Sequence, residues 1–517
     1  MILVLPAAVV GVWQVLLPSW QTVRLSMFSV PGWGRGQSRF LGLEAYLGPR
    51  DDWLVGFGAL VGVAVFVVVS LVGLLVGALT ARAHGATRLA IRAVLGVTMI
   101  IYAPIGIGLS LRTGLRGVPD AQALFWILCV AMLPITAALT AVVIASATRP
   151  DGVTTPRARV VTAVMMIGLG LVTAFALGLQ MLALPRLVIG NGADTPGQAI
   201  YRSAFQFLDI SRAAAISTAM LVVLAGLGVI VTVALLMLQL QVELARDEPE
   251  PVAATGTGST RLHTTGSVKR PGTIALAITL LTLVVLLVIT RDWVLGLAAP
   301  VPDGLSTADV DIIVTNTWVP PAIATAVQVL VGGLAGFGIG ALRPLGRNSE
   351  VLLLLFAPAL FIGLTPLLTA NVLAAADGVR LADISLLPPL LLGVPAVFVF
   401  TFVFAGLRRA WARESAARVQ VLLAALSTVV LVGVLSWVVQ AQTATWNLVL
   451  ADNSSRVTGP VLLSRLASRD PLAPLPQQLA TPLPLLLVLA VLAAFATMGT
   501  DRLVVRVGPL RNRLSRG

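Results

Sequence analysis

Long apolar runs separated by short polar segments dominate the chain. A helix needs roughly 20 consecutive apolar residues to cross a bilayer. The runs that approach this length lie near residues 2–18, 54–81, 92–111, 122–147, 160–184, 213–241, 273–290, 316–342, 350–370, 386–407, 419–440 and 481–499. Many of them contain Gly and Pro, which membrane helices tolerate. The pattern predicts an all-α integral membrane protein with twelve transmembrane helices.

The composition agrees with this pattern. Of the 517 residues, 57% are hydrophobic and only 11% are charged, and the mean hydropathy is +0.97. Soluble domains average about 25% charged residues. A chain with so few charges cannot solvate its own surface in water. The lipid bilayer is therefore the first expected partner of this protein.

The charged residues are distributed unevenly between alternate loops. The loops near 82–92, 149–159, 242–272, 343–350 and 408–418, together with the tail from Asp501, hold 21 basic and 8 acidic residues. The rest of the chain holds 14 of each, so the net charge of +13 belongs to one face. Basic loops mark the cytoplasmic face of a membrane protein. We therefore expect both termini in the cytoplasm, and we read the positive charge as orientation and lipid contact, with no nucleic-acid partner.

One polar segment divides the chain into two similar parts. Residues 242–272 are first charged and then rich in Gly and Thr, which is typical of a flexible linker. Six predicted helices precede this segment and six follow it. The predicted organisation is an N-terminal six-helix half at 1–241, a cytoplasmic linker at 242–272 and a C-terminal six-helix half at 273–517. Two joined halves of this kind are typical of a transporter.

The chain lacks the usual residues for metal or nucleotide chemistry. Cys129 is the only cysteine, and the two histidines, His84 and His263, are far apart, so no metal site is expected. The single lysine, Lys269, lies outside any phosphate-loop spacing. We expect no cofactor and no enzymatic activity in this chain, and any ATP hydrolysis would belong to separate subunits.

Several short motifs occur in each half of the chain, at defined positions relative to the predicted helices. The first half contains Phe40-Leu-Gly-Leu-Glu-Ala-Tyr46 before a long helix, and Tyr201-Arg-Ser-Ala-Phe205 before another. The second half contains Asn316-Thr317, Arg343-Pro-Leu-Gly-Arg347 and Trp446-Asn447. In these motifs and their positions the chain resembles the permeases of maltose-type (carbohydrate) ABC importers. The resemblance covers both halves, as a fusion of two permease subunits.

This resemblance implies a function and a set of partners. It implies alternating access for a sugar or similar polar solute, delivered by an extracytoplasmic solute-binding protein. It implies ABC ATPase subunits that bind ATP and drive the transport step. It also implies a multi-pass protein of a prokaryotic-type plasma membrane.

The resemblance places one ATPase-coupling loop between the fourth and fifth predicted helices. The family has a Glu-Ala-Ala-x-x-x-Gly motif there, which forms a short helix in a cleft of the ATPase. In this chain Ala147, Asp151 and Gly152 match the motif, Ser146 takes the place of Glu, and Pro150 is foreign to it. The predicted coupling residues are Ser146, Ala147, Asp151 and Gly152.

The second coupling loop is expected within residues 408–418. There the predicted coupling residues are Arg413, Glu414, Ala416 and Ala417, although the Asp-Gly pair is missing. These departures leave two interpretations open. The loops either dock on an ATPase or are degenerate, with weakened or lost coupling.

Two other functions compete with a permease. Asp51 and Asp52 lie just before the second predicted helix, where membrane glycosyltransferases place acidic residues; a solvated pair at a helix N-terminus is the simpler explanation, and no other residues support sugar transfer. A secondary transporter shares the arrangement of two six-helix halves. Such a transporter commonly carries ionisable residues inside its membrane helices, and the predicted spans contain almost none.

Overall fold

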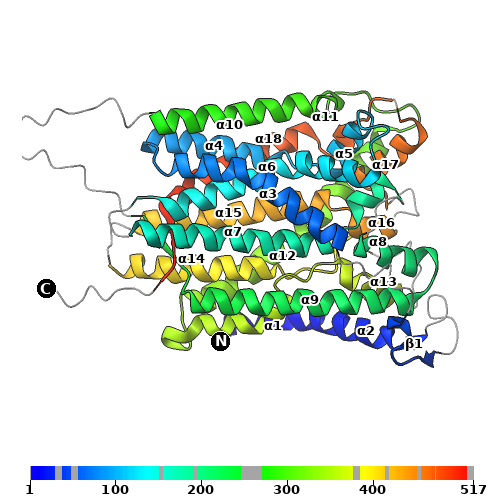
Figure 1. The fold of residues 1–517 in the computed structure, drawn as a ribbon, viewed down its shortest axis with the longest axis horizontal. Helices are drawn as coiled ribbons and strands as arrows, with labels where there is room; N and C mark the ends of the chain where they lie inside the picture. Colours follow the sequence, from blue (N-terminus) through cyan, green and yellow to red (C-terminus); the bar gives the residue numbers. More distant parts are fainter. Residues whose placement is uncertain are drawn as a thin grey trace, which may run out of the picture.

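The protein is a bundle of long, roughly parallel and antiparallel helices (Figure 1). A computed structural model describes residues 2–29, 38–47, 56–150, 155–190, 195–245, 270–376, 385–413, 418–450, 456–471 and 473–508. Ten helices in these residues are long and apolar enough to cross a membrane, and a bent pair makes an eleventh if it counts as one span. The described chain is thus all-α in character and multi-pass by length and composition.

We call residues 2–245 the N-terminal half. Its helices are α1 (Leu5–Gly11), α2 (Leu17–Ser26), α3 (Gly56–Thr80), α4 (Gly85–Ile100), α5 (Pro104–Arg112), α6 (Asp120–Thr148), α7 (Pro156–Leu179), α8 (Pro196–Tyr201) and α9 (Ile210–Met237). Single turns at Ile2–Val4 and Val12–Leu16 join α1 and α2 into one apolar span, Ile2–Ser26. The half ends in strand β3 (Gln241–Leu244).

We call residues 270–508 the C-terminal half. Its helices are α10 (Arg270–Ile289), α11 (Arg291–Gly296), α12 (Thr307–Gly340), α13 (Leu368–Ala376), α14 (Val394–Arg413), α15 (Arg418–Gln442), α16 (Thr445–Leu450), α17 (Gly459–Arg469) and α18 (Leu483–Gly499). This half also ends in a strand, β4 (Leu503–Arg506). A second strand pair, β1 (Phe28–Ser29) with β2 (Arg39–Phe40), lies at the opposite end of the bundle (Figure 1).

Glycines allow the second and fourth spans of each half to approach closely. In α3, Gly73 and Gly77 face the carbonyls of α6, and a Cβ at either position would press on the α6 backbone. In α12, Gly336 and Gly340 face α14 in the same way. Lipid gives little hydrophobic drive for helices to associate, so small residues four apart promote close van der Waals packing. The same device at the same place in both halves supports an internal repeat.

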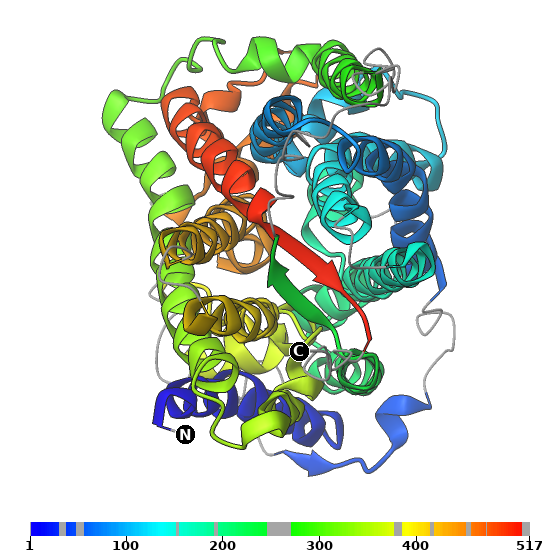
Figure 2. The same cartoon turned by 90° about the vertical axis from the view of Figure 1, so that its left-hand side faces the viewer.

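The two halves exchange elements reciprocally. The N-terminal turn Ile2–Val4 and α1 pack on α12, while α10 packs on α3 and α4. In addition α4 packs on α18, and α9 packs on the turn Ala357–Ala359. Figure 2 shows these elements end-on, with first helices at opposite edges of the bundle. Each half is therefore completed by the other.

The third span is broken in both halves. In the N-terminal half α4 and α5 meet at a bend of 72°. Pro104 starts α5, and a residue before proline disfavours helical angles, which accounts for the break at Ala103. In the C-terminal half, residues 350–370 do not form the continuous helix that the apolar run predicts. They form short 3-10 turns, Gly346–Leu355, Ala357–Ala359 and Thr365–Leu367, before α13.

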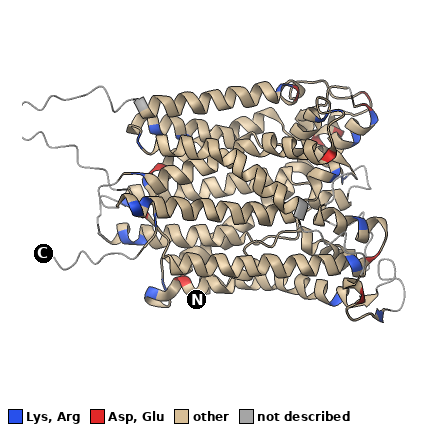
Figure 3. Cartoon of the chain, in the orientation of Figure 1, with Lys and Arg blue, Asp and Glu red and all other residues tan. Residues whose placement is uncertain are grey.

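The charged residues gather at the two ends of the bundle (Figure 3). The middle of the described helices is nearly free of them, as a membrane interior requires. Ile2 and Gly508, the two ends of the described chain, lie at the same end of the bundle as β3 and β4. The contacts of Leu3 and Val4 with Gly338 and of Gly508 with Leu238 fix them there.

Candidate functional site

The two halves meet in a small antiparallel sheet at one end of the bundle. Strands β3 and β4 pair Gln241 with Arg506 and Leu244 with Leu503 at the two limits of the register. The backbone N–H of Ala245 extends the pairing by donating to the carbonyl of Arg502 at 2.6 Å. Figure 2 shows this pair near the centre of the bundle end. Because an isolated two-stranded sheet is marginally stable, its packing on neighbouring helices matters.

Each strand packs on the fourth span of the other half. Strand β4 contacts α6, and β3 contacts α14. The contact of β3 is especially close, because a Cβ at Gly406 in α14 would overlap the carbonyl oxygen of Val242. The strand pair is therefore a crossed connection. Strand β3, at the end of the N-terminal half, reaches α14, which precedes the second predicted coupling loop. Strand β4, at the end of the C-terminal half, reaches α6, which precedes the first predicted coupling loop.

The Asp501 cluster, formed by Arg88, Arg92, Arg149 and Asp501, connects the halves beside β4. Arg88 Nε lies 2.8 Å from both carboxylate oxygens of Asp501, and Arg92 Nε lies 2.9 Å from Oδ1. Arg149 Nη1 lies 3.9 Å from Oδ2 and donates to the Asp501 carbonyl at 2.8 Å. The acid comes from the segment after α18, whereas all three arginines belong to the N-terminal half. The cluster thus attaches the end of the chain to α4 and to the end of α6.

Arg92 is the most deeply buried member of this cluster, with 2% of its side chain exposed. Its guanidinium donates to Thr500 Oγ1 at 3.1 Å and to Ser146 Oγ at 3.0 Å. Its own carbonyl accepts a hydrogen bond from Thr497 at 2.8 Å. A buried charge is tolerated only when it is paired and hydrogen-bonded. These partners, together with Asp501, allow a charged side chain to lie between α4, α6 and α18.

The Glu243 cluster, formed by Glu243, Arg409 and Arg506, lies on the other side of the strand pair. Glu243 Oε1 lies 3.2 Å from Arg409 Nη1, and Oε2 lies 2.7 Å from Arg506 Nη1. Arg409 also reaches Gln241 Oε1 at 3.3 Å. Here the acid ends the N-terminal half and both arginines belong to the C-terminal half. The arrangement mirrors the Asp501 cluster with the halves exchanged.

The structure places part of the first predicted coupling loop beside these clusters. Ser146 and Ala147 are buried in the last turn of α6, and the Ser146 hydroxyl faces Arg92. Their surroundings suit a role in holding the helix end, with any ATPase contact made by the residues that follow. Asp151 and Gly152 lie outside the described residues.

The second predicted coupling loop is described only at its start. Arg413 is the last residue of α14, four residues beyond Arg409 of the Glu243 cluster. Glu414, Ala416 and Ala417 lie outside the described residues. The docking role of both loops remains a prediction.

A second polar contact joins the halves farther inside the bundle. At the end of α7, Gln180 Nε2 donates to the carbonyl of Phe361 at 2.8 Å, and its Oε1 accepts from Gly363 N–H at 2.7 Å. Thr365 Oγ1 donates to the Gln180 carbonyl at 2.7 Å. The break in the C-terminal third span frees these backbone groups, and Gln180 satisfies them. Gln180 thus links the two halves through three hydrogen bonds.

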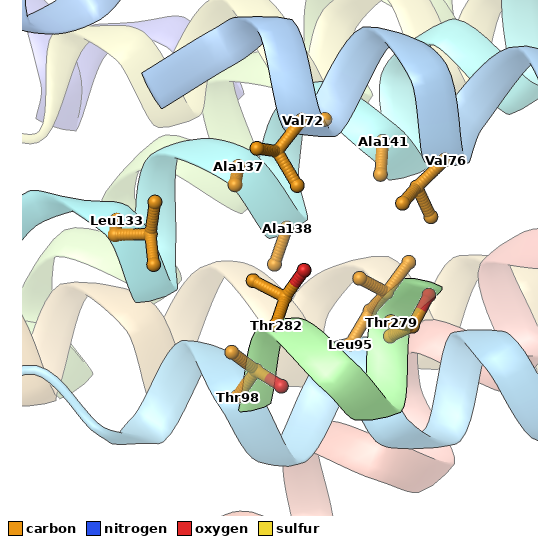
Figure 4. Close-up of a pocket in the computed structure, with 11 residues that line it drawn as sticks. Val72, Val76, Leu95, Thr98, Leu133, Ala137, Ala138, Ala141, Thr279 and Thr282 are labelled. Carbon is orange, nitrogen blue, oxygen red and sulfur yellow. The ribbon is translucent and has the colours of Figure 1, made fainter. Parts of the chain in front are cut away.

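The pocket shown in Figure 4 lies between α3, α4, α6 and α10 and contains about 330 Å³ of space, part of it open to the surface. Its lining is apolar apart from Thr98, Thr279 and Thr282. Each of these hydroxyls donates to a carbonyl of its own helix. The pocket therefore offers little hydrogen bonding to a polar solute.

The described residues carry no cluster suited to metal binding. No group of three or more His, Cys, Asp or Glu side chains among them could hold a metal ion. Asp51 and Asp52, the acids considered for sugar transfer, lie outside the described residues. Among the described residues, charged contacts between the two halves occur in the two clusters on the strand pair.

Sequence reasoning missed the residues that hold the two halves together. The charge pattern places Asp501 in a basic C-terminal segment and Glu243 in a linker, and it gives neither residue a partner. A signal was available in Arg92, which stands in an apolar run and needs a buried partner. The partner is 409 positions away and could not be named from one sequence.

No family model and no curated protein matches this chain. The structure and the sequence motifs therefore carry the functional argument.

Proposed function

We propose that this chain is the membrane-spanning permease of an ATP-driven importer. The observation that supports this best is the reciprocal exchange between two similar halves. First helices cross over, each third span packs on the opposite sixth span, and each terminal strand packs on the opposite fourth span. Repeats that complete each other around a common axis suit alternating access, in which one half moves against the other.

Counting the broken third span in each half as one membrane crossing gives twelve spans. This count puts the strand-pair end of the bundle on the side of both chain ends. The excess of basic residues in the corresponding loops makes that side cytoplasmic. The loops after α6 and α14 then face the cytoplasm, where ATPase subunits of an importer would bind. The membrane would be a prokaryotic-type plasma membrane.

The substrate class rests on the resemblance and on the chemistry of the interior. A sugar or similar neutral polar solute, brought by an extracytoplasmic binding protein, fits helices whose middle is nearly free of charge. The contact between the halves includes amide and hydroxyl groups such as Gln180 and Thr365, which are bonded across the boundary in this structure and become free for a solute only when the halves move apart. Breaks in transmembrane helices commonly mark the solute path because they free backbone groups.

The interior does not favour a proton-coupled transporter. Proton coupling commonly uses ionisable side chains inside the spans. Among the described residues the carboxylates lie in loops, in short turns, in strand β3 or near helix ends; Asp309 is in the first turn of α12, and Asp311 follows two positions later. ATP hydrolysis on separate subunits fits such an interior better than proton coupling.

Reconstitution tests the proposal directly. The chain is purified in mild detergent with candidate ABC ATPases and tested for a stable complex, then for solute uptake in proteoliposomes. We expect a complex and uptake that requires ATP. Uptake driven by an ion gradient without an ATPase would contradict the proposal, as would sugar transfer to a lipid acceptor.

A further inference from the structure

We propose that β3, β4, Glu243 and Asp501 form a crossed latch that holds the cytoplasmic ends of the two halves together and must open during transport. Its role in transport rests on the proposed function. Its structural part, that these groups hold the strand pair on the opposite fourth spans, does not depend on any ATPase.

The topology of the latch is the first argument. Asp501 belongs to the end of the C-terminal half and contacts Arg149 at the end of α6. Glu243 belongs to the end of the N-terminal half and contacts Arg409 near the end of α14. Both carboxylates therefore cross from one half to the helix that leads into the coupling loop of the other. The ends of α6 and α14 cannot move apart while both contacts and the strand pairing persist.

The burial of the latch is the second argument. Val504 of β4 is 2% exposed and stands opposite Glu243 in the register. Val242 is also buried, against the close approach at Gly406. Exchange of these groups with water therefore requires the strands to leave their helices. This gives an opening event that can be measured chemically.

Thiol labelling measures the opening. Val504→Cys reports on the latch, and the native Cys129, buried in α6, reports on the bundle as a whole. When reclosing is fast, the labelling rate of a buried thiol follows the population of the open state. In purified protein without an ATPase, we expect a water-soluble maleimide to label Val504→Cys at least about tenfold faster when Asp501→Asn is added. We expect about a two- to fivefold increase with Glu243→Gln, whose contacts are partly exposed.

A matched control exists at the same end of the bundle. Glu350 pairs with Arg343 at 2.6 Å with similar exposure, but both residues belong to the C-terminal half. Glu350→Gln should leave the labelling of Val504→Cys unchanged. Unchanged labelling in both Asp501→Asn and Glu243→Gln would overturn the latch, as would an equal increase in Glu350→Gln. If Asp501→Asn also exposes Cys129, it has disturbed the whole bundle, and Glu243→Gln decides.

Locking the strands tests the role in transport. Val242 and Val505 are opposite each other in the register, so Val242→Cys and Val505→Cys in a Cys129→Ala background can be joined by oxidation or by a short thiol cross-linker. We expect uptake to fall at least about tenfold on locking and to recover when the link is cleaved. Full uptake by the locked protein would overturn this role. Failure of the proposed function looks different: no ATP-dependent uptake by the unlocked protein, with the labelling results intact.

Discussion

The Asp501 and Glu243 clusters occupy matching places in the two halves but differ in burial. Arg92 and Asp501 expose 2% and 9% of their side chains, whereas Glu243, Arg409 and Arg506 expose between 21% and 26%. Buried charges depend strictly on their partners, because an unpaired one is left without solvent. Partly exposed pairs can exchange their partners for water at a lower cost. We call the Asp501 cluster the fixed corner of the latch, because it opens at a high cost, and the Glu243 cluster the releasable corner, because it opens at a low cost.

We expect the largest effect on stability when the buried acid, Asp501, is neutralised. Asp501→Asn removes the carboxylate while Arg92 stays buried, so we expect the free energy of unfolding to fall by about 3–5 kcal/mol. Thermal unfolding in detergent, followed by loss of the monodisperse species, measures the change. Asp303→Asn, at an exposed loop position, is the control and should have little effect. If Asp501→Asn is as stable as Asp303→Asn, the buried carboxylate contributes no more to stability than an exposed one, and burial does not distinguish the two corners.

A second test removes the close approach on the Glu243 side. Gly406→Ala places a methyl group where the Val242 carbonyl lies, and the obstructing atom belongs to the backbone and cannot rotate away. We expect a loss of about 1–3 kcal/mol, as for other overpacked sites. Gly226→Ala in α9 is the matched control, because no atom lies within 4 Å of the added Cβ. There alanine should be neutral or stabilising by up to about 1 kcal/mol. If both variants behave alike in unfolding experiments, β3 is not held against α14.

The sequence predicts a large part of the fold because apolar length is a strong signal. The runs at 122–147 and 213–241 correspond to α6 and α9, within a few residues. The run at 350–370 misled this reasoning, since it is apolar enough for a helix. Pro358, Gly363 and Pro366 lie within it, and the chain forms 3-10 turns there. Hydrophobicity measures affinity for lipid, and it does not measure whether a backbone can remain helical.

The candidate site was much less predictable for a physical reason. Motif order predicts where a first coupling loop would lie, and the helix end before it, with Ser146, lies beside the Asp501 cluster. The contacts that define the site join positions as far apart as Arg88 and Asp501, separated by 413 residues. Periodicity reports only on neighbours within a helix. Pairing between halves is set by the packing of the whole bundle, which one sequence does not reveal.

A third, smaller effect sharpens the role of the fixed corner. Ser146→Ala removes one acceptor of the Arg92 guanidinium but leaves Asp501 and Thr500 in place. We expect a loss of about 1.5 kcal/mol, typical of a hydrogen bond to a charged group. The control is Thr148→Ala, whose hydroxyl donates only within its own helix, to Ile144. If Ser146→Ala is as stable as Thr148→Ala, the ion pairs alone stabilise the fixed corner.

The smallest expected effect falls on the releasable corner. Glu243→Gln keeps a side chain that can accept from Arg409 and Arg506, and these partners retain access to water. We expect the free energy of unfolding to change by only about 0.2–1 kcal/mol. The effect should shrink further at high salt, because a partly exposed ion pair is screened more than a buried one. Unfolding at low and high salt, with Glu350→Gln as the control inside one half, measures this. A salt-independent loss as large as that of Asp501→Asn would mean that both corners are fixed, and that the cytoplasmic ends part somewhere other than at Glu243.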